Sequence, residues 1–174
     1  MKPALYKTAL ALSYFTIAYN LSEGLIAMGL GFKDETLSLF GFGVDSMIEM
    51  VSGLGIMQMV LRIGRNPHSE VPGFEVTSLR ITGYGFLVLA VGLVVGIIFN
   101  IIQHHTPETT IWGAVIALVS IVVMVLLYRA KIRVGRGLQS EPMLADASCT
   151  LICIYMSLVL LIASAVYELS LIHI

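Results

Sequence analysis

Charged side chains are scarce in this chain. Asp, Glu, Lys and Arg make up only 12% of the 174 residues, whereas 57% are hydrophobic, and the mean hydropathy is +0.93. This composition excludes a soluble globular protein and indicates an integral membrane protein, with the lipid bilayer as its surroundings. A formal net charge of −1 provides no basic surface, so we expect no nucleic-acid partner.

Cysteine is also scarce, and the usual enzyme motifs are absent. The only two cysteines, Cys149 and Cys153, are four residues apart in one apolar run, a helical spacing that rarely meets disulfide geometry. They are therefore free thiols or metal ligands. The sequence has no His-Glu-x-x-His, Gly-x-Ser-x-Gly, phosphate-binding loop or Cys-x-x-Cys motif. We therefore predict that the protein is not an enzyme and has no organic cofactor.

Long apolar runs predict an all-α fold, a polytopic transmembrane helix bundle. About 20 apolar residues in a helix cross a hydrocarbon core of roughly 30 Å. Five runs have this character: Tyr6–Leu30, Leu37–Leu61, Leu79–Ile102, Ile111–Tyr128 and Met143–Tyr167. Lys2 and Lys7 stand near the start of the first run, as basic residues do in a signal peptide, but the apolar stretch runs on to Leu30 with no small-residue cleavage site, so we expect a retained helix.

The basic residues predict the orientation of the bundle. Of the ten Lys and Arg residues, only Lys33 falls outside the N-terminus, the second-to-third link and the fourth-to-fifth link. By the positive-inside rule, the N-terminus is cytoplasmic and the protein is multi-pass in the inner (cytoplasmic) membrane. The fourth-to-fifth link is assigned four basic residues: Arg129, Lys131, Arg133 and Arg136.

The second apolar run carries two acids, Asp45 and Glu49. A carboxylate near the bilayer centre costs roughly 2.5–3.5 kcal/mol on insertion scales, so these groups must face protein, water or a cation. A four-residue step turns a helix through about 400°, so both carboxylates leave the same face. No lysine or arginine is assigned to the middle of any span as their partner. The pattern predicts a cation site.

The fifth run places Cys149 and Cys153 at the same four-residue spacing. The second and fifth spans run antiparallel, so side by side they bring Asp45 near the depth of Cys153 and Glu49 near that of Cys149. Two carboxylates and two thiols can form a tetrahedral site for zinc or a similar divalent metal. Free cysteine is also a common small buried residue, so the role of the thiols stays open.

Further polar side chains support this face. Asp146 and Thr150 share the face of the cysteines, and Asn20 and Glu23 share a face of the first run. We expect Asp146 and Glu23 to carry protons or to line the inner and outer parts of a path, with Asn20 and Thr150 supporting the ligands. For Glu23 a hydrogen bond between helices is the alternative.

Two segments carry a family resemblance. The segment Gly41-Phe-Gly-Val-Asp45-Ser-Met-Ile-Glu49 and the segment Ala145-Asp146-Ala-Ser-Cys149-Thr-Leu-Ile-Cys153 resemble the transmembrane domain of the cation diffusion facilitators. The closer likeness is to a short branch without the cytoplasmic metal-binding domain, and it covers residues 1–168. The resemblance implies that a divalent metal, usually zinc, binds between spans two and five and is exchanged for protons. The family's fifth-span ligands, commonly histidine and aspartate, fall on the two cysteines, which leaves the metal and transport itself open.

The same resemblance implies six spans, of which five are present. The tail, residues 169–174, looks like the translation of a transposase mosaic-end sequencing adapter, so we expect a non-native tail on a reading frame truncated after the fifth span. In the family, spans three and six pair outside a bundle of spans one, two, four and five. The face of Gly92 and Gly96 on span three would then lack its partner. We predict poor stability or self-association through that face, such as a homodimer.

The sequence as a whole predicts a zinc-like divalent cation transporter that exports metal in exchange for protons. Asp45, Glu49, Cys149 and Cys153 are the predicted metal ligands. The alternatives are a membrane protein that binds or senses metal without moving it, and a helical scaffold whose buried acids pair across helices.

Overall fold

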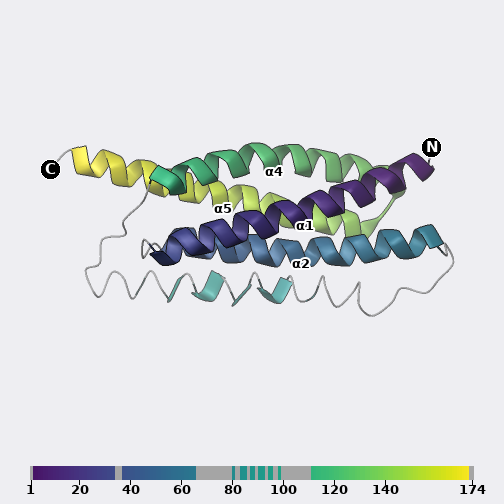
Figure 1. Cartoon of the computed structure of the whole chain (residues 1–174), viewed down its shortest axis with the longest axis horizontal. Coiled ribbons are helices and arrows are strands. Elements are labelled where there is room, and N and C mark those ends of the chain that lie inside the picture. Colours follow the sequence, from purple (N-terminus) through teal and green to yellow (C-terminus); the bar gives the residue numbers. More distant parts are fainter. Residues whose placement is uncertain are drawn as a thin grey trace.

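The protein is all-α, as predicted. The computed structural model describes residues 2–33, 37–65, 80, 83–85, 87–88, 90–92, 94–95, 98 and 111–172. Its long helices are α1 (Lys2–Lys33), α2 (Leu37–Arg65), α4 (Ile111–Leu138) and α5 (Glu141–Ile172). They form two antiparallel hairpins, α1 with α2 and α4 with α5. The hairpins pack together through α1 against α4 and α2 against α5 (Figure 1).

The third predicted span is described only in part. Its described residues, between 80 and 98, are helical. A Cβ added at Gly85 would lie 3.2 Å from the side chain of Ile48, so this stretch approaches α2. A Cβ added at Gly92 would meet no atom within 4 Å. Gly96, the predicted loops at 66–79 and 103–110, and the last two residues of the predicted tail lie outside the described residues.

Within the described part of the chain, three helices are long and apolar enough to cross a membrane: Leu39–Ile63, Gly113–Leu138 and Glu141–Ile162. Large apolar side chains stand exposed on the outward faces of α4 and α5, as lipid contact requires; they include Leu118, Val122, Leu126, Tyr155 and Val159. Helix α1, which holds the first predicted span, is not among these three. Its buried side chains include the hydrophilic Ser13, Thr16, Asn20 and Glu23.

Two apolar clusters occupy the two ends of the bundle, and the polar side chains lie between them. The cluster at the α4–α5 turn contains Ala9, Ile56, Met59, Val60, Val134 and Met143. The cluster at the other end contains Ala27, Leu39, Phe42, Ala117 and Leu160. The buried polar groups described below are therefore shielded at both ends by packed apolar side chains.

Glycines allow α1 and α2 to approach each other closely. A Cβ at Gly43 would lie 2.6 Å from the backbone nitrogen of Met28, and a Cβ at Gly31 would lie 2.4 Å from that of Phe40. Real Cβ atoms do not tolerate such distances, so only glycine fits at these positions. The close approach fixes how α2 presents its acids to the rest of the bundle.

A two-residue turn joins α4 to α5. Gln139 is in the left-handed conformation, with φ of 52°. Its N–H donates to the carbonyl of Arg136 at 3.2 Å, and the N–H of Ser140 donates to that of Gly135 at 3.0 Å. This pair of bonds is the Schellman arrangement that ends many helices. Ser140 then precedes α5 at the N-cap position, where serine is favoured.

The prediction that Arg129 to Arg136 lie in an inner loop between spans four and five is wrong. The four basic residues assigned to it lie in α4, which continues to Leu138. The hydropathy falls at Arg129, but the backbone hydrogen bonds of the helix do not depend on hydropathy. Three of these residues, Arg129, Arg133 and Arg136, keep their side chains exposed, while Lys131 turns inward.

Candidate cation site

Helix α2 brings both of its acids to the centre of the bundle. Asp45 and Glu49 are fully buried, with 0% of each side chain exposed, and Ser46 and Ser52 are buried beside them. The four-residue step places the two carboxylates on one face of α2, as helical geometry requires. An ionised carboxylate is costly to bury without a partner, so the surroundings of each oxygen decide what the site can do.

Most of the carboxylate oxygens are left without a full hydrogen bond. Beyond the thiol of Cys153, which is a weak donor, no described residue hydrogen-bonds either oxygen of Asp45. Oε2 of Glu49 also has no hydrogen-bond partner among the described residues beyond this thiol, which interacts with both acids. Three buried carboxylate oxygens thus retain acceptor capacity, which a cation or an added proton would satisfy.

The two cysteines lie on α5 across from these acids. Cys153 is buried, with 2% exposed, and lies close enough to interact electrostatically with both Asp45 and Glu49. Cys149 is only partly buried and interacts with Asp146 and Glu49. Both thiols are free. In the described parts of the chain, no three His, Cys, Asp or Glu side chains are grouped to hold a metal ion together.

A buried lysine occupies the space between α2, α4 and α5. Nζ of Lys131, whose side chain is 1% exposed, lies 3.3 Å from Oε1 of Glu49 and 2.8 Å from Oδ2 of Asp146. It also donates to the hydroxyl of Thr150 at 2.8 Å. That hydroxyl donates in turn to Oε1 of Glu49. Ser52 donates to the other oxygen of Asp146 at 2.7 Å.

The sequence prediction that the acids have no basic partner is therefore wrong for Glu49 and Asp146. Hydropathy ends the fourth span at Tyr128 and places Lys131 in a loop. The signal that finds it is helical spacing. Lys131 continues the buried face of Met124, Leu127 and Val134 on α4, whereas the arginines beside it do not.

A further buried acid, Glu23, lies on α1. Its carboxylate accepts hydrogen bonds from the hydroxyl of Tyr19 at 2.8 Å and from that of Ser46 on α2 at 2.9 Å. Glu23 interacts electrostatically with both Asp45 and Glu49. These three buried carboxylates thus lie near enough to influence one another inside the bundle.

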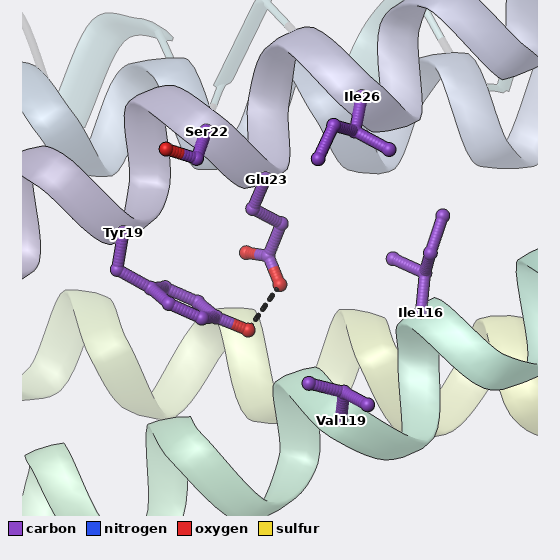
Figure 2. Close-up of a pocket in the computed structure, with 6 residues that line it drawn as sticks. All are labelled: Tyr19, Ser22, Glu23, Ile26, Ile116 and Val119. Carbon is purple, nitrogen blue, oxygen red and sulfur yellow. Dashed lines mark hydrogen bonds between the residues drawn. The ribbon is translucent and has the colours of Figure 1, made fainter.

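A pocket opens beside Glu23, between α1 and α4. It has a volume of about 180 Å³. Figure 2 shows Tyr19 and Glu23 facing Ile116 and Val119 across this space. The lining of this pocket is apolar apart from the Tyr19–Glu23 pair and Ser22.

Asn20 and Thr16 complete the polar face of α1. Both are fully buried, and neither the amide of Asn20 nor the hydroxyl of Thr16 has a hydrogen-bond partner among the described residues. On α2, Ser46 contacts Glu23 and Gly53 approaches Thr16. Asn20 lies between Thr16 and Glu23 on α1, so it faces the part of α2 between Ser46 and Gly53. Asn20 therefore lies near the level of Glu49, where its carbonyl oxygen adds a neutral acceptor.

The amino-acid sequence matches the model of a known family. The family model for the cation efflux transmembrane domain matches residues 13–174. The chain belongs to the cation efflux family. No curated protein and no solved structure matches it significantly. Cation efflux proteins are multi-pass membrane proteins that transport divalent cations and are not enzymes.

Proposed function

We propose that this cation efflux protein exports a divalent, zinc-like metal ion from the cytoplasm in exchange for protons. The ion binds between α2 and α5, with Asp45 and Glu49 as its primary ligands. Cys153 and Cys149 complete the ligand set. The N-terminus lies in the cytoplasm, and the protein resides in the inner membrane.

One observation carries the proposal: buried carboxylate oxygens without hydrogen-bond partners at the centre of a membrane bundle. Both oxygens of Asp45 and one oxygen of Glu49 have this property among the described residues, apart from the Cys153 thiol. A structural pair of acids would have its oxygens satisfied by neighbouring donors. Unsatisfied acceptors that face one thiol form a site in which a cation supplies the missing partner. Oxygen and sulfur donors together suit a borderline metal such as zinc.

Proton coupling follows from the chemistry of these ligands. Carboxylates and thiols bind metal in their deprotonated forms, so metal loading releases protons and protonation expels metal. Glu23 lines the pocket between α1 and α4 and interacts with the buried acids of α2, so it would carry protons between the pocket and the site.

Zinc uptake into inside-out membrane vesicles tests the proposal. With an acidic vesicle lumen, that is, an outward proton gradient, the wild-type protein should accumulate zinc, because protons leave the lumen as zinc enters. The double variant Asp45→Asn, Glu49→Gln should lower the initial rate to that of vesicles without the protein, because it removes both anionic ligands while it preserves side-chain size.

Glu141→Gln is the matched control, since Glu141 is an exposed acid in the first turn of α5. It should leave the zinc rate within about twofold of wild type, as expected for a surface substitution. Unchanged uptake in the double variant would overturn the proposed mechanism.

A helical scaffold is the alternative that one observation favours. Glu49 and Asp146 both pair with Lys131, as buried acids in a purely structural network would. The scaffold predicts that the wild-type protein neither binds nor transports zinc, so the same vesicle experiment separates it from the transporter.

A further inference from the structure

We propose that Lys131 is a tethered cation that competes with the transported metal ion for Glu49. The inference rests on the proposed function, because it takes Asp45 and Glu49 as the metal ligands. It assigns a specific task to a residue of α4, which contributes no ligand to the predicted site.

The geometry places the lysine at the edge of the site. Its ammonium lies 3.3 Å from Oε1 of Glu49, while Oε2 of the same carboxylate has no partner among the described residues beyond the thiol of Cys153. Glu49 is therefore shared: one oxygen faces the lysine, and the other is open. A metal ion that takes Glu49 as a ligand meets a fixed positive charge a few ångströms away and must weaken or displace its contact with Glu49.

The lysine has a second partner that can hold it when this contact is lost. Asp146 lies closer to the ammonium than Glu49 does, at 2.8 Å, and is itself fixed by the hydroxyl of Ser52. Thr150 touches both Lys131 and Glu49, so its hydroxyl is freed from one of them when the two separate. The lysine can thus leave Glu49 without losing its charge partner.

Such competition suits a transporter. A site that passes ions must bind them strongly enough to load and weakly enough to release. A built-in cation lowers the affinity for metal, and it compensates the charge of Glu49 when the metal leaves. Removal of this cation should tighten metal binding and slow release.

The decisive variant is Lys131→Met with Asp146→Asn. It removes one positive and one negative charge, so the net charge of the cluster is unchanged. Replacing a buried ion pair by neutral side chains is often neutral for stability or stabilising. In Asp146→Asn the amide oxygen can still accept the hydrogen bond from Ser52, and the hydroxyl of Thr150 can still donate a hydrogen bond to Glu49. That carboxylate, a proposed ligand, is then free of its internal competitor.

The single variant Asp146→Asn provides the opposite change. The ammonium of Lys131 then loses its closer carboxylate, so it should hold Glu49 more strongly. A purely structural role for the cluster would weaken zinc binding in both variants. Competition by Lys131 instead predicts tighter zinc binding in the double variant and weaker zinc binding in Asp146→Asn.

Calorimetric titration of the purified protein with Zn²⁺ at constant pH measures the effect. The double variant should bind zinc about tenfold or more tightly than wild type, with slower zinc transport in vesicles, and Asp146→Asn should bind it more weakly. Wild-type zinc binding with unchanged or weaker affinity in the double variant would overturn the competition and leave the proposed function intact. Absence of zinc binding by wild type and variants alike would overturn both.

Discussion

At the scale of single residues, the stability of the polar layer depends on Lys131. Its ammonium pairs with both Glu49 and Asp146. Lys131→Met alone removes this shared partner from two buried carboxylates. We expect it to lower the free energy of unfolding by about 3–5 kcal/mol, as for other broken buried ion pairs. Thermal unfolding in detergent measures the change.

Lys7→Met is the matched control, because Lys7 is exposed near the start of α1. It should change the stability by no more than about 0.5 kcal/mol. The double variant Lys131→Met, Asp146→Asn should recover part of the lost stability, because only Glu49 is then left without its charged partner. Equal stability of Lys131→Met and wild type would show that the ion pairs do not hold the helices together.

The same residues show what the sequence could and could not reveal about the site. Asp45 and Glu49 stand out because carboxylates are rare in apolar runs and their spacing puts them on one face. Lys131 is hidden among surface arginines, since hydropathy averages over a window and cannot separate the one basic side chain that turns inward. Its contacts with α2 and α5 depend on the packing of three helices, which local sequence does not encode.

At the scale of helices, the tight contact between α1 and α2 depends on glycine. Gly43→Ala would place a Cβ 2.6 Å from the backbone nitrogen of Met28, so the two helices would have to separate. We expect a loss of about 1–3 kcal/mol in the free energy of unfolding, typical of overpacking. Denaturation in mixed detergent measures the change.

Gly29→Ala is the control for this prediction. A Cβ at Gly29 would meet no atom within 4 Å, and alanine favours helix by up to about 1 kcal/mol over glycine. This variant should therefore be as stable as wild type or more stable. If both alanine variants behave alike, the contact between α1 and α2 is looser than the structure describes.

In the turn between α4 and α5, a substitution should raise the free energy of unfolding instead of lowering it. Gln139 adopts a left-handed conformation that costs a non-glycine residue roughly 1–2 kcal/mol. Gln139→Gly should raise the free energy of unfolding by about 1 kcal/mol, whereas Gln139→Ala should give no gain because alanine has the same Cβ. The comparison of the two variants by thermal unfolding isolates the backbone effect.

The helix types and their order were predictable, but their ends were not. Apolar runs indicated where the long helices lie, and α2 begins at the predicted Leu37. Helix α4 extends beyond its apolar run because three of its basic side chains point outward and the fourth, Lys131, finds buried acidic partners. Only the hydrogen bonds at Gln139 and Ser140 end α4, and their pattern is not visible in hydropathy.

At the scale of the whole molecule, the ends of the bundle define two sides. Leu5 on α1 contacts Gly137 at the end of α4, because a Cβ on the glycine would lie 3.0 Å from the leucine side chain. The start of α1 and the end of α4 therefore share one end of the bundle, and the end of α1 lies at the other (Figure 1).

Cysteine labelling tests the proposed orientation. Exposed Lys7 and Arg136 lie at the first end and exposed Lys33 at the second. A membrane-impermeant maleimide should label Lys7→Cys and Arg136→Cys only in inside-out vesicles, and Lys33→Cys in intact cells, above the signal from the native cysteines. Labelling of Lys7→Cys in intact cells would reverse the predicted topology.

The position of Lys131 also has a consequence for how the chain is made. Glu49 leaves the ribosome long before Lys131, and Asp146 follows after it, so the three charges can meet only when α5 has entered the membrane. Until then the lysine can keep its ammonium at the lipid–water boundary by extending its flexible stem. Closure of this charge cluster therefore has to await α5, and a chain that stalls earlier carries unpaired charges in its apolar helices.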